Sequence, residues 1–105
     1  MPGAFEIPTA IRLAMESKKY HGYVALGCVI RGDTTHYDYV CGESARGLMD
    51  LGLQFGASIG YGILTVENPE QAWVRARVSE GNKGRDAVEA CLCLIQLKQQ
   101  FGGKA

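Results

Sequence analysis

The apolar positions near the start of the chain lie on one face of a helix. They recur at the i, i+3, i+4, i+7, i+8 spacing of a helix with one buried side. Pro8 is tolerated only in a first helical turn, which places the start near Glu6, and Lys18 and Lys19 suit the C-terminal end. The spacing is carried by Ile7, Ala10, Ile11, Ala14 and Met15.

Two later segments, residues 23–30 and 58–66, are nearly continuous apolar runs. Runs without alternation are typical of strands buried on both faces of a parallel sheet, so we predict two such strands. Gly60 and Gly62 interrupt the second run. Between the runs, the pattern predicts a polar turn over 31–35 and a helix over about 36–53.

The last third of the chain predicts two more helices. Asn68 can cap the first, Pro69 takes its first position and Gln71 can reach back in a capping box. This helix is expected to end near Arg77, and the last helix to follow residues 81–82 and stop near Phe101. One apolar face of the last helix is formed by Ala87, Ala90, Cys91, Leu94 and Ile95.

Helices alternating with strands predict an α/β fold with a parallel sheet and helices on both faces, in a single domain over residues 1–105. Two strands cannot bury both sheet faces against four helices and also protect both edges. Because the chain opens on a helix, we expect further strands to be absent from it or supplied by another chain.

Composition excludes some classes of function. The 11 basic and 11 acidic side chains leave no net charge, which argues against a nucleic-acid or anionic-membrane surface. No apolar run approaches the roughly 18 residues of a membrane span, and no leader is evident, so we predict a cytoplasmic protein. The four cysteines are expected to be buried thiols rather than metal ligands, since Cys91 and Cys93, two apart, point to different helix faces.

The turn over 31–36 is the first candidate site, because ligands of open α/β sheets bind beyond the carboxyl ends of the strands. Backbone amides, the Thr34 hydroxyl and the following helix start would suit a phosphate. A plain capped turn explains the same residues. His36 is suited to proton transfer near neutral pH, or is a solvated surface histidine.

A second candidate is a basic set near residues 81–84, where arginine could grip a phosphate with two hydrogen bonds. Solvation of helix faces is the simpler interpretation. Trp73 and Tyr61 could lie in the core or stack on a heterocycle. The basic residues are Arg75, Arg77, Lys83 and Arg85.

Four blocks, taken together and in order, resemble the lumazine synthase family. They are residues 2–8 (PGAFEIP), 27–40 (GCVIRGDTTHYDYV), 62–72 (GILTVENPEQA) and 81–84 (GNKG), and they span nearly the whole chain. The resemblance implies a flavodoxin-like three-layer sandwich with a parallel sheet. It also implies that this chain lacks the family's first strands and first helix, which lie ahead of Pro2.

The resemblance further implies a transferase of riboflavin biosynthesis. The family condenses 5-amino-6-ribitylamino-pyrimidinedione with 3,4-dihydroxy-2-butanone 4-phosphate, releases phosphate and water, and forms 6,7-dimethyl-8-ribityllumazine. No cofactor and no metal are expected. The partners would be these small-molecule substrates and copies of the chain, in pentamers or larger shells with active sites between subunits.

Matching positions imply one set of roles close to the turn at 31–36. His36 would be the proton donor, and Asp33 and Thr34 would contact the phosphate of the butanone. The ribityl chain would be held by Ala4, Phe5 and Glu6. The pyrimidinedione would be bound, largely through backbone groups, by Cys28, Val29 and Ile30.

The remaining roles would come from a neighbouring subunit. Arg75 would be the main cation for the phosphate and a catalytic residue, with Lys83 nearby. Tyr61 would pack on the ring system, at a position where phenylalanine is usual in the family. Ser79 replaces a basic residue found in many relatives, and the Asp33 carboxylate would repel phosphate unless its backbone amide makes the contact.

Two other interpretations stay open. The chain could be a catalytically weak, truncated fragment that binds ligand or supports assembly. It could instead be a flavodoxin-like module for flavin-type ligands, although His36 and the lack of a glycine-rich dinucleotide motif count against this.

Overall fold

A computed structural model describes residues 3–32, 36–77 and 81–102 of the chain. Its α-helices and strands match the predicted ones in type and order, with boundaries that differ by a few residues, and a short 3₁₀ helix, η1, precedes the first of them and was not predicted. They are η1 (Ala4–Glu6), α1 (Ile7–Ser17), β1 (Tyr23–Ile30), α2 (His36–Phe55), β2 (Ile59–Val66), α3 (Pro69–Ala76) and α4 (Lys83–Gln100).

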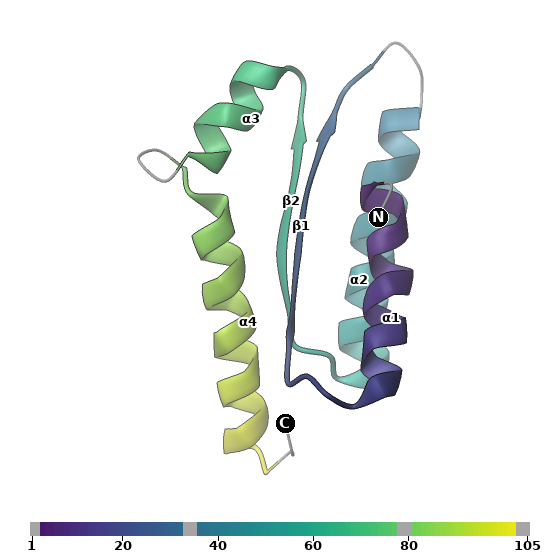
Figure 1. Cartoon of the computed structure of the whole chain (residues 1–105), viewed down its shortest axis with the longest axis vertical. Helices are drawn as coiled ribbons and strands as arrows, with labels where there is room; N and C mark the ends of the chain where they lie inside the picture. The colour runs from purple at the N-terminus through teal and green to yellow at the C-terminus, as the bar shows by residue number, and fades with distance from the viewer. Residues whose placement is uncertain (1–2, 33–35, 78–80, 103–105) are drawn as a thin grey trace.

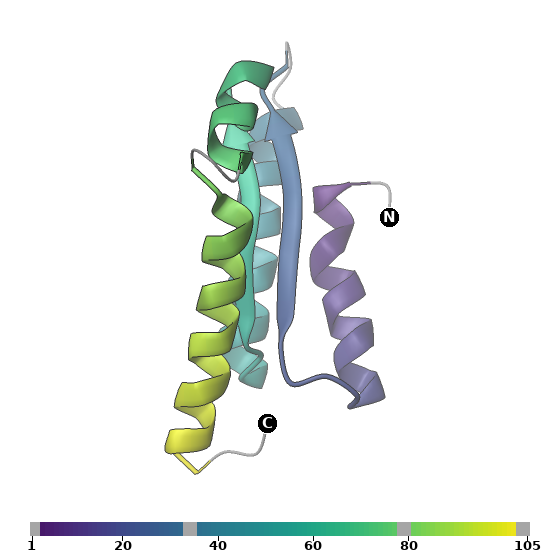
Figure 2. The same ribbon diagram turned by 60° about the vertical axis from the view of Figure 1, so that its left-hand side comes forward.

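The described residues form three layers around a two-stranded parallel sheet (Figure 1). β1 and β2 pair in register from Tyr23 with Ile59 to Ile30 with Val66. α1 and α2 cover one face, and α4 lies on the other, as the rotated view in Figure 2 shows. The predicted α/β, flavodoxin-like arrangement with a parallel sheet is confirmed.

The core lies between the sheet and the helices α1 and α2. Successive strand residues point to opposite faces, so the odd-numbered residues of β1 and β2 face these two helices. Burying an aliphatic side chain of this kind contributes about 1.5–3 kcal/mol. The buried cluster consists of Ile7, Ile11, Ala25, Leu48, Leu51 and Ile63.

On the opposite face, α4 presses directly on the backbone of β2. A Cβ atom added to Gly60 would lie 1.7 Å from the carbonyl oxygen of Ala87, and one added to Gly62 would lie 3.0 Å from the Ala87 Cβ. Only glycine fits at 60, because any side chain would push the helix away. The two glycines that interrupt the apolar run therefore allow close packing between strand and helix.

Burial of β1 on both faces, predicted from its apolar run, is wrong. Leu26 is 58% exposed, Ile30 is 44% exposed and Val24 is 37% exposed, all on the α4 side of the sheet. The reason is that α4 lies mainly over β2 and leaves this face of β1 largely uncovered. The expectation that the sheet needs further strands or another chain fits this exposure.

The prediction of buried cysteines is also wrong for most of the four. Cys28 lies on the uncovered side of β1 and is exposed, as is Cys93, while Cys41 is half-buried. Cys91 alone is buried, on the face of α4 that packs on the sheet, where its thiol approaches the carbonyl of Ser58 at 3.5 Å.

The start of α3 is held by side-chain caps, as predicted, with one difference. Asn68 Oδ1 accepts a hydrogen bond of 2.9 Å from the Gln71 N–H. The Gln71 side chain reaches past the cap residue and accepts from the Glu67 N–H at 2.8 Å. Asn82 caps α4 by accepting from the Arg85 N–H at 3.4 Å. Within the described ranges, no helix is long and apolar enough to cross a membrane.

Candidate functional site

A pocket of about 720 Å³ opens at the carboxyl end of β1, between η1 and the first turns of α2. It brings together seven of the residues singled out from the sequence, which come from three separate segments. These are Ala4, Phe5, Glu6, Cys28, Val29, Ile30 and His36.

Sequence reasoning missed the other residues of the lining. Tyr39, Val40 and Glu43 follow His36 at the i+3, i+4 and i+7 positions, so one face of α2 presents all four. That spacing was visible in the sequence and could have identified them. Gly3 completes the lining ahead of η1.

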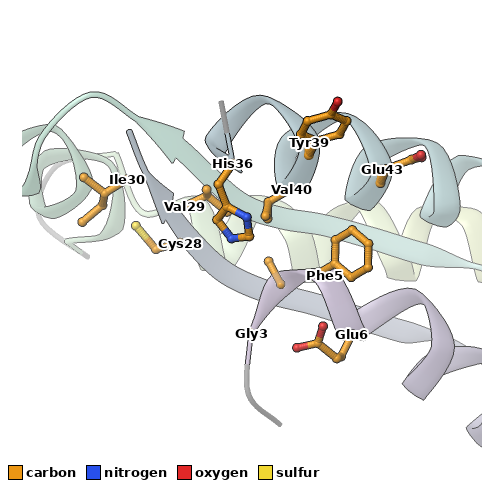
Figure 3. Close-up of a pocket in the computed structure, with 11 residues that line it drawn as sticks. Gly3, Phe5, Glu6, Cys28, Val29, Ile30, His36, Tyr39, Val40 and Glu43 are labelled. Carbon is orange, nitrogen blue, oxygen red and sulfur yellow. The ribbon is translucent and has the colours of Figure 1, made fainter. Parts of the chain in front are cut away.

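The imidazole of His36 points from α2 toward η1, where Phe5 lies, as Figure 3 shows. On the far side of the opening, the Glu6 carboxylate turns toward the segment at Gly3, and one of its oxygens would lie 3.9 Å from a Cβ on that glycine. The Glu6 N–H donates to the Gly3 carbonyl at 3.2 Å, which holds this short turn closed. A carboxylate and an imidazole thus border the same opening.

The edge of β1 supplies main-chain groups to the same pocket. Tyr23 and Arg31 donate their N–H groups to Ser58 and Val66 across the ladder, so odd-numbered residues point their main-chain groups at β2. The main-chain groups of Cys28 and Ile30 therefore point to the opposite edge. No described strand pairs with that edge. A planar ligand with donors and acceptors could bind there by hydrogen bonds like those of a strand.

A second, smaller pocket of about 200 Å³ lies along β2 and contains Tyr61, Arg75 and Lys83. Arg75 comes from α3 and Lys83 opens α4. Arg75 donates from Nη1 to the carbonyl of Gln71 at 3.2 Å, and Lys83 pairs with Asp86 at 3.5 Å. Two cations beside an exposed strand edge suit an anion such as a phosphate.

Tyr61 lies at this edge and is 44% exposed, with Cys41 and Ser44 of α2 near its phenol. Burial raises the pKa of its phenol, Cys41 adds to the rise, and the nearby Ser44 hydroxyl opposes it. The ring is therefore neutral at physiological pH and offers a flat apolar surface. Trp73, the other aromatic considered for stacking, is 61% exposed on α3 near Arg77 and is not a core residue.

The two pockets do not merge, and their linings share no residue. The candidate residues thus fall into two groups, which we call the β1 half-site (Glu6, Cys28, Ile30 and His36) and the β2 half-site (Tyr61, Arg75 and Lys83). Asp33 and Thr34 lie outside the described residues. Among those described, no three potential ligands gather in a way that would hold a metal ion.

Comparison with known proteins identifies the family. Residues 1–99 match the family model described as 6,7-dimethyl-8-ribityllumazine synthase. The chain belongs to this family. A lumazine synthase from Bartonella tribocorum is 57% identical over 103 residues, covering 97% of this chain and 68% of its own length.

Other members of the lumazine synthase family give the same picture. The synthase from Bartonella henselae is 56% identical over 104 residues, with 97% of this chain and 67% of its own length covered. The 6,7-dimethyl-8-ribityllumazine synthase 1 of Rhizobium meliloti is 53% identical over 109 residues and is covered over 71% of its length. The chain thus spans roughly two thirds of these relatives.

Proposed function

We propose that this chain forms 6,7-dimethyl-8-ribityllumazine, as a transferase of riboflavin biosynthesis. It would condense 5-amino-6-ribitylamino-pyrimidinedione with 3,4-dihydroxy-2-butanone 4-phosphate and release phosphate and water. The observation that carries the proposal is the β1 half-site, where a carboxylate, an imidazole and unpaired main-chain groups border one pocket.

The pyrimidinedione substrate matches the edge of β1. Its ring carries alternating carbonyl and N–H groups, which the main-chain groups of Cys28 and Ile30 could pair with, while Val29 lies beside them. The ribityl chain carries hydroxyl groups, and these can donate hydrogen bonds to the Glu6 carboxylate. Ala4 and Phe5 would hold the apolar side of that chain.

His36 would move the protons of the reaction. The amine of the pyrimidinedione attacks the ketone of the butanone, water leaves as the imine forms, and phosphate leaves with its bonding electron pair. Ring closure follows, in which the ribitylamino nitrogen bonds to the remaining carbonyl carbon and the oxygen of that carbonyl leaves as a second water. Each step needs a group that gains and loses a proton near neutral pH, which suits an imidazole.

The β2 half-site would bind the phosphate. Negative charge builds on the phosphate as its C–O bond breaks, and Arg75 with Lys83 would neutralise it. Asp33 and Thr34, implied by the resemblance, would add contacts from the other side. Because the two half-sites of one chain occupy different pockets, we propose that each complete site pairs the β1 half-site of one subunit with the β2 half-site of its neighbour.

Such pairing requires a ring of subunits, and we propose a pentamer-based homo-oligomer. Large apolar side chains on the outer faces support assembly, among them Leu53 at 77% exposure, Leu92 and Phe101. The same exposed faces favour the second candidate function, a catalytically weak module that binds ligand or assembles without efficient turnover.

Mixed oligomers test the shared site. His36→Ala and Arg75→Ala chains, each inactive alone, are co-expressed and lumazine formation is followed by absorbance. Random mixing in a ring should restore roughly a quarter of the wild-type rate, because one interface in four pairs two intact half-sites. A matched control replaces the second chain with the double variant, which can complete no site. Absence of recovery in verified mixed oligomers would overturn the shared site.

The same assay separates the two candidate functions. Turnover by the unmodified chain supports the synthase. Binding of the pyrimidinedione substrate or its product without turnover would support the binding or assembly module.

A further inference from the structure

Arg31 connects β1, β2 and α2 at the carboxyl ends of the two strands. Its Nε lies 2.8 Å from Glu67 Oε2, just beyond β2, and its Nη2 lies 3.5 Å from Asp38 Oδ1 in the first turn of α2. The guanidinium also sits 4.4 Å from the ring centroid of Tyr37. Its own N–H donates to the Val66 carbonyl at 2.8 Å, so the residue is held at both its backbone and its side chain.

One end of this network lies next to the proton-transfer group. Asp38 and Tyr37 directly follow His36, and all three belong to the first turn of α2. Both neighbours contact the same guanidinium. The orientation of that first turn, and hence of the His36 imidazole, is therefore tied to the position of Arg31.

The other end leads to the phosphate-binding cation. The Glu67 carboxylate forms an ion pair with the Arg31 guanidinium, and the main-chain N–H of Glu67 donates to Gln71 Oε1 at 2.8 Å. The carbonyl of Gln71 in turn accepts from Arg75 Nη1 at 3.2 Å. Contacts therefore run without a break from the first turn of α2, through Arg31 and Glu67, to Arg75.

We propose that Arg31 is a positioning residue that sets the spacing and orientation between the β1 half-site and the β2 half-site of one chain. The inference rests on the proposed function. In the proposed ring, every subunit contributes to two sites. The distance and angle between its two half-sites therefore determine how well each half-site aligns with the half-site of the neighbouring subunit. Errors of about 1 Å in such placement cost roughly 100-fold in rate.

The geometry requires arginine at this position. The guanidinium uses two nitrogens toward two carboxylates and its flat face toward a ring, whereas an ammonium is a single point charge. The pairs are exposed, with Arg31 at 43% and Glu67 at 56% side-chain exposure, and exposed ion pairs add little to stability. A role in placement is therefore separable from a role in folding.

The test compares Arg31→Gln and Arg31→Lys with Arg85→Gln. Arg85, one of the basic residues considered from the sequence, lines neither pocket of the proposed site. It is a matched control, because it also pairs with a glutamate, Glu89, at 2.9 Å, but only within α4. We expect both Arg31 variants to lower kcat about 10-fold or more, with a smaller change in KM for the pyrimidinedione and melting temperatures close to that of Arg85→Gln. Full activity in Arg31→Lys would overturn the requirement for a forked side chain.

A second measurement does not depend on turnover. The ring-proton resonance of His36 is assigned by comparison with His36→Asn and then recorded in each variant. It should move in both Arg31 variants and stay in place in Arg85→Gln. An inactive wild-type chain would count against the proposed function alone. An unmoved His36 resonance, or Arg31→Gln kinetics equal to those of Arg85→Gln, would overturn the positioning role.

Discussion

The two half-sites of this chain present different groups to a ligand. The β1 half-site presents the main chain of Cys28 and Ile30, with Glu6 and His36 at its border. The β2 half-site presents the side-chain charges of Arg75 and Lys83 beside Tyr61. The first suits a neutral ring with directional hydrogen bonds, and the second suits an anion.

This difference divides the proposed chemistry between subunits. Main-chain groups are fixed in direction by the strand, so they can discriminate between donors and acceptors on a ring. Long cationic side chains adapt their position and neutralise charge as it develops. Four variants, each with a matched control, follow from the largest expected effect to the smallest. The first two test this division of chemistry, and the other two test the packing and the ionisation of β2, which carries part of the β2 half-site.

Removal of the imidazole should have the largest effect. His36→Ala is expected to lower kcat by about 10²–10⁴-fold, the usual contribution of a positioned general acid or base. Its pH–rate profile should also lose the dependence that the imidazole contributes. His21, the only other histidine of the sequence and exposed near β1, is the control. An equal loss in His21→Ala would contradict the assignment.

Removal of the main cation of the β2 half-site should come next. Arg75→Ala is expected to lower kcat by about 10²–10³-fold and to raise KM for the butanone phosphate more than KM for the pyrimidinedione. Arg12→Ala, which removes an arginine paired with Glu16 on α1, is the control and should leave both constants nearly unchanged. Steady-state kinetics with each substrate varied in turn would show whether the phosphate substrate alone is affected.

The packing of α4 on β2 can be broken without touching either half-site. Gly60→Ala would force its Cβ against the Ala87 carbonyl oxygen and should cost about 3 kcal/mol. A loss of that size would lower the melting temperature by roughly 12 °C or more. Gly42→Ala is the control, since no atom lies within 4 Å of its added Cβ on α2, and it should stabilise by about 0.5–1 kcal/mol. Thermal unfolding by circular dichroism measures both.

The smallest effect concerns Tyr61. Because burial raises its pKa, the folded chain keeps this proton when the unfolded chain begins to lose it, near pH 10. The stability that the neutral phenol contributes is therefore complete below about pH 10 and falls as the pH rises beyond it. Tyr61→Phe should flatten this decline, and Tyr20→Phe, at an exposed ring, should not. Urea unfolding between pH 8 and 11 would detect the difference.

Secondary structure was largely predictable here, because apolar spacing and local caps determine it. Pro8, Asn68 and Pro69 mark helix starts that the structure reproduces. The exposure of β1 was not predictable, since an apolar run cannot show how far α4 extends across the sheet. The position of Cys28 on the uncovered side follows from the same tertiary detail.

The candidate site could be predicted only as separate segments. His36 and Glu6 are 30 positions apart, and their approach depends on how α1 and α2 pack together. The ion pair between Arg31 and Glu67 depends on the directions of their side chains at the ends of β1 and β2, and the spacing of residues along the chain does not encode those directions. In contrast, Tyr39 and Glu43 could have been predicted from the sequence, because they follow His36 at helical spacing.

The unpaired edge of β1 also bears on how this protein can change over generations. In the proposed site, recognition by the N–H and C=O groups of Cys28 and Ile30 belongs to the backbone, and substitutions at these positions would leave it intact unless they introduce proline. Genetic drift would then alter both side chains while the proposed selectivity for the ring persists. Saturation mutagenesis of positions 28 and 30 should find most substitutions tolerated and proline rejected at each, in contrast to the narrow tolerance expected at Arg75.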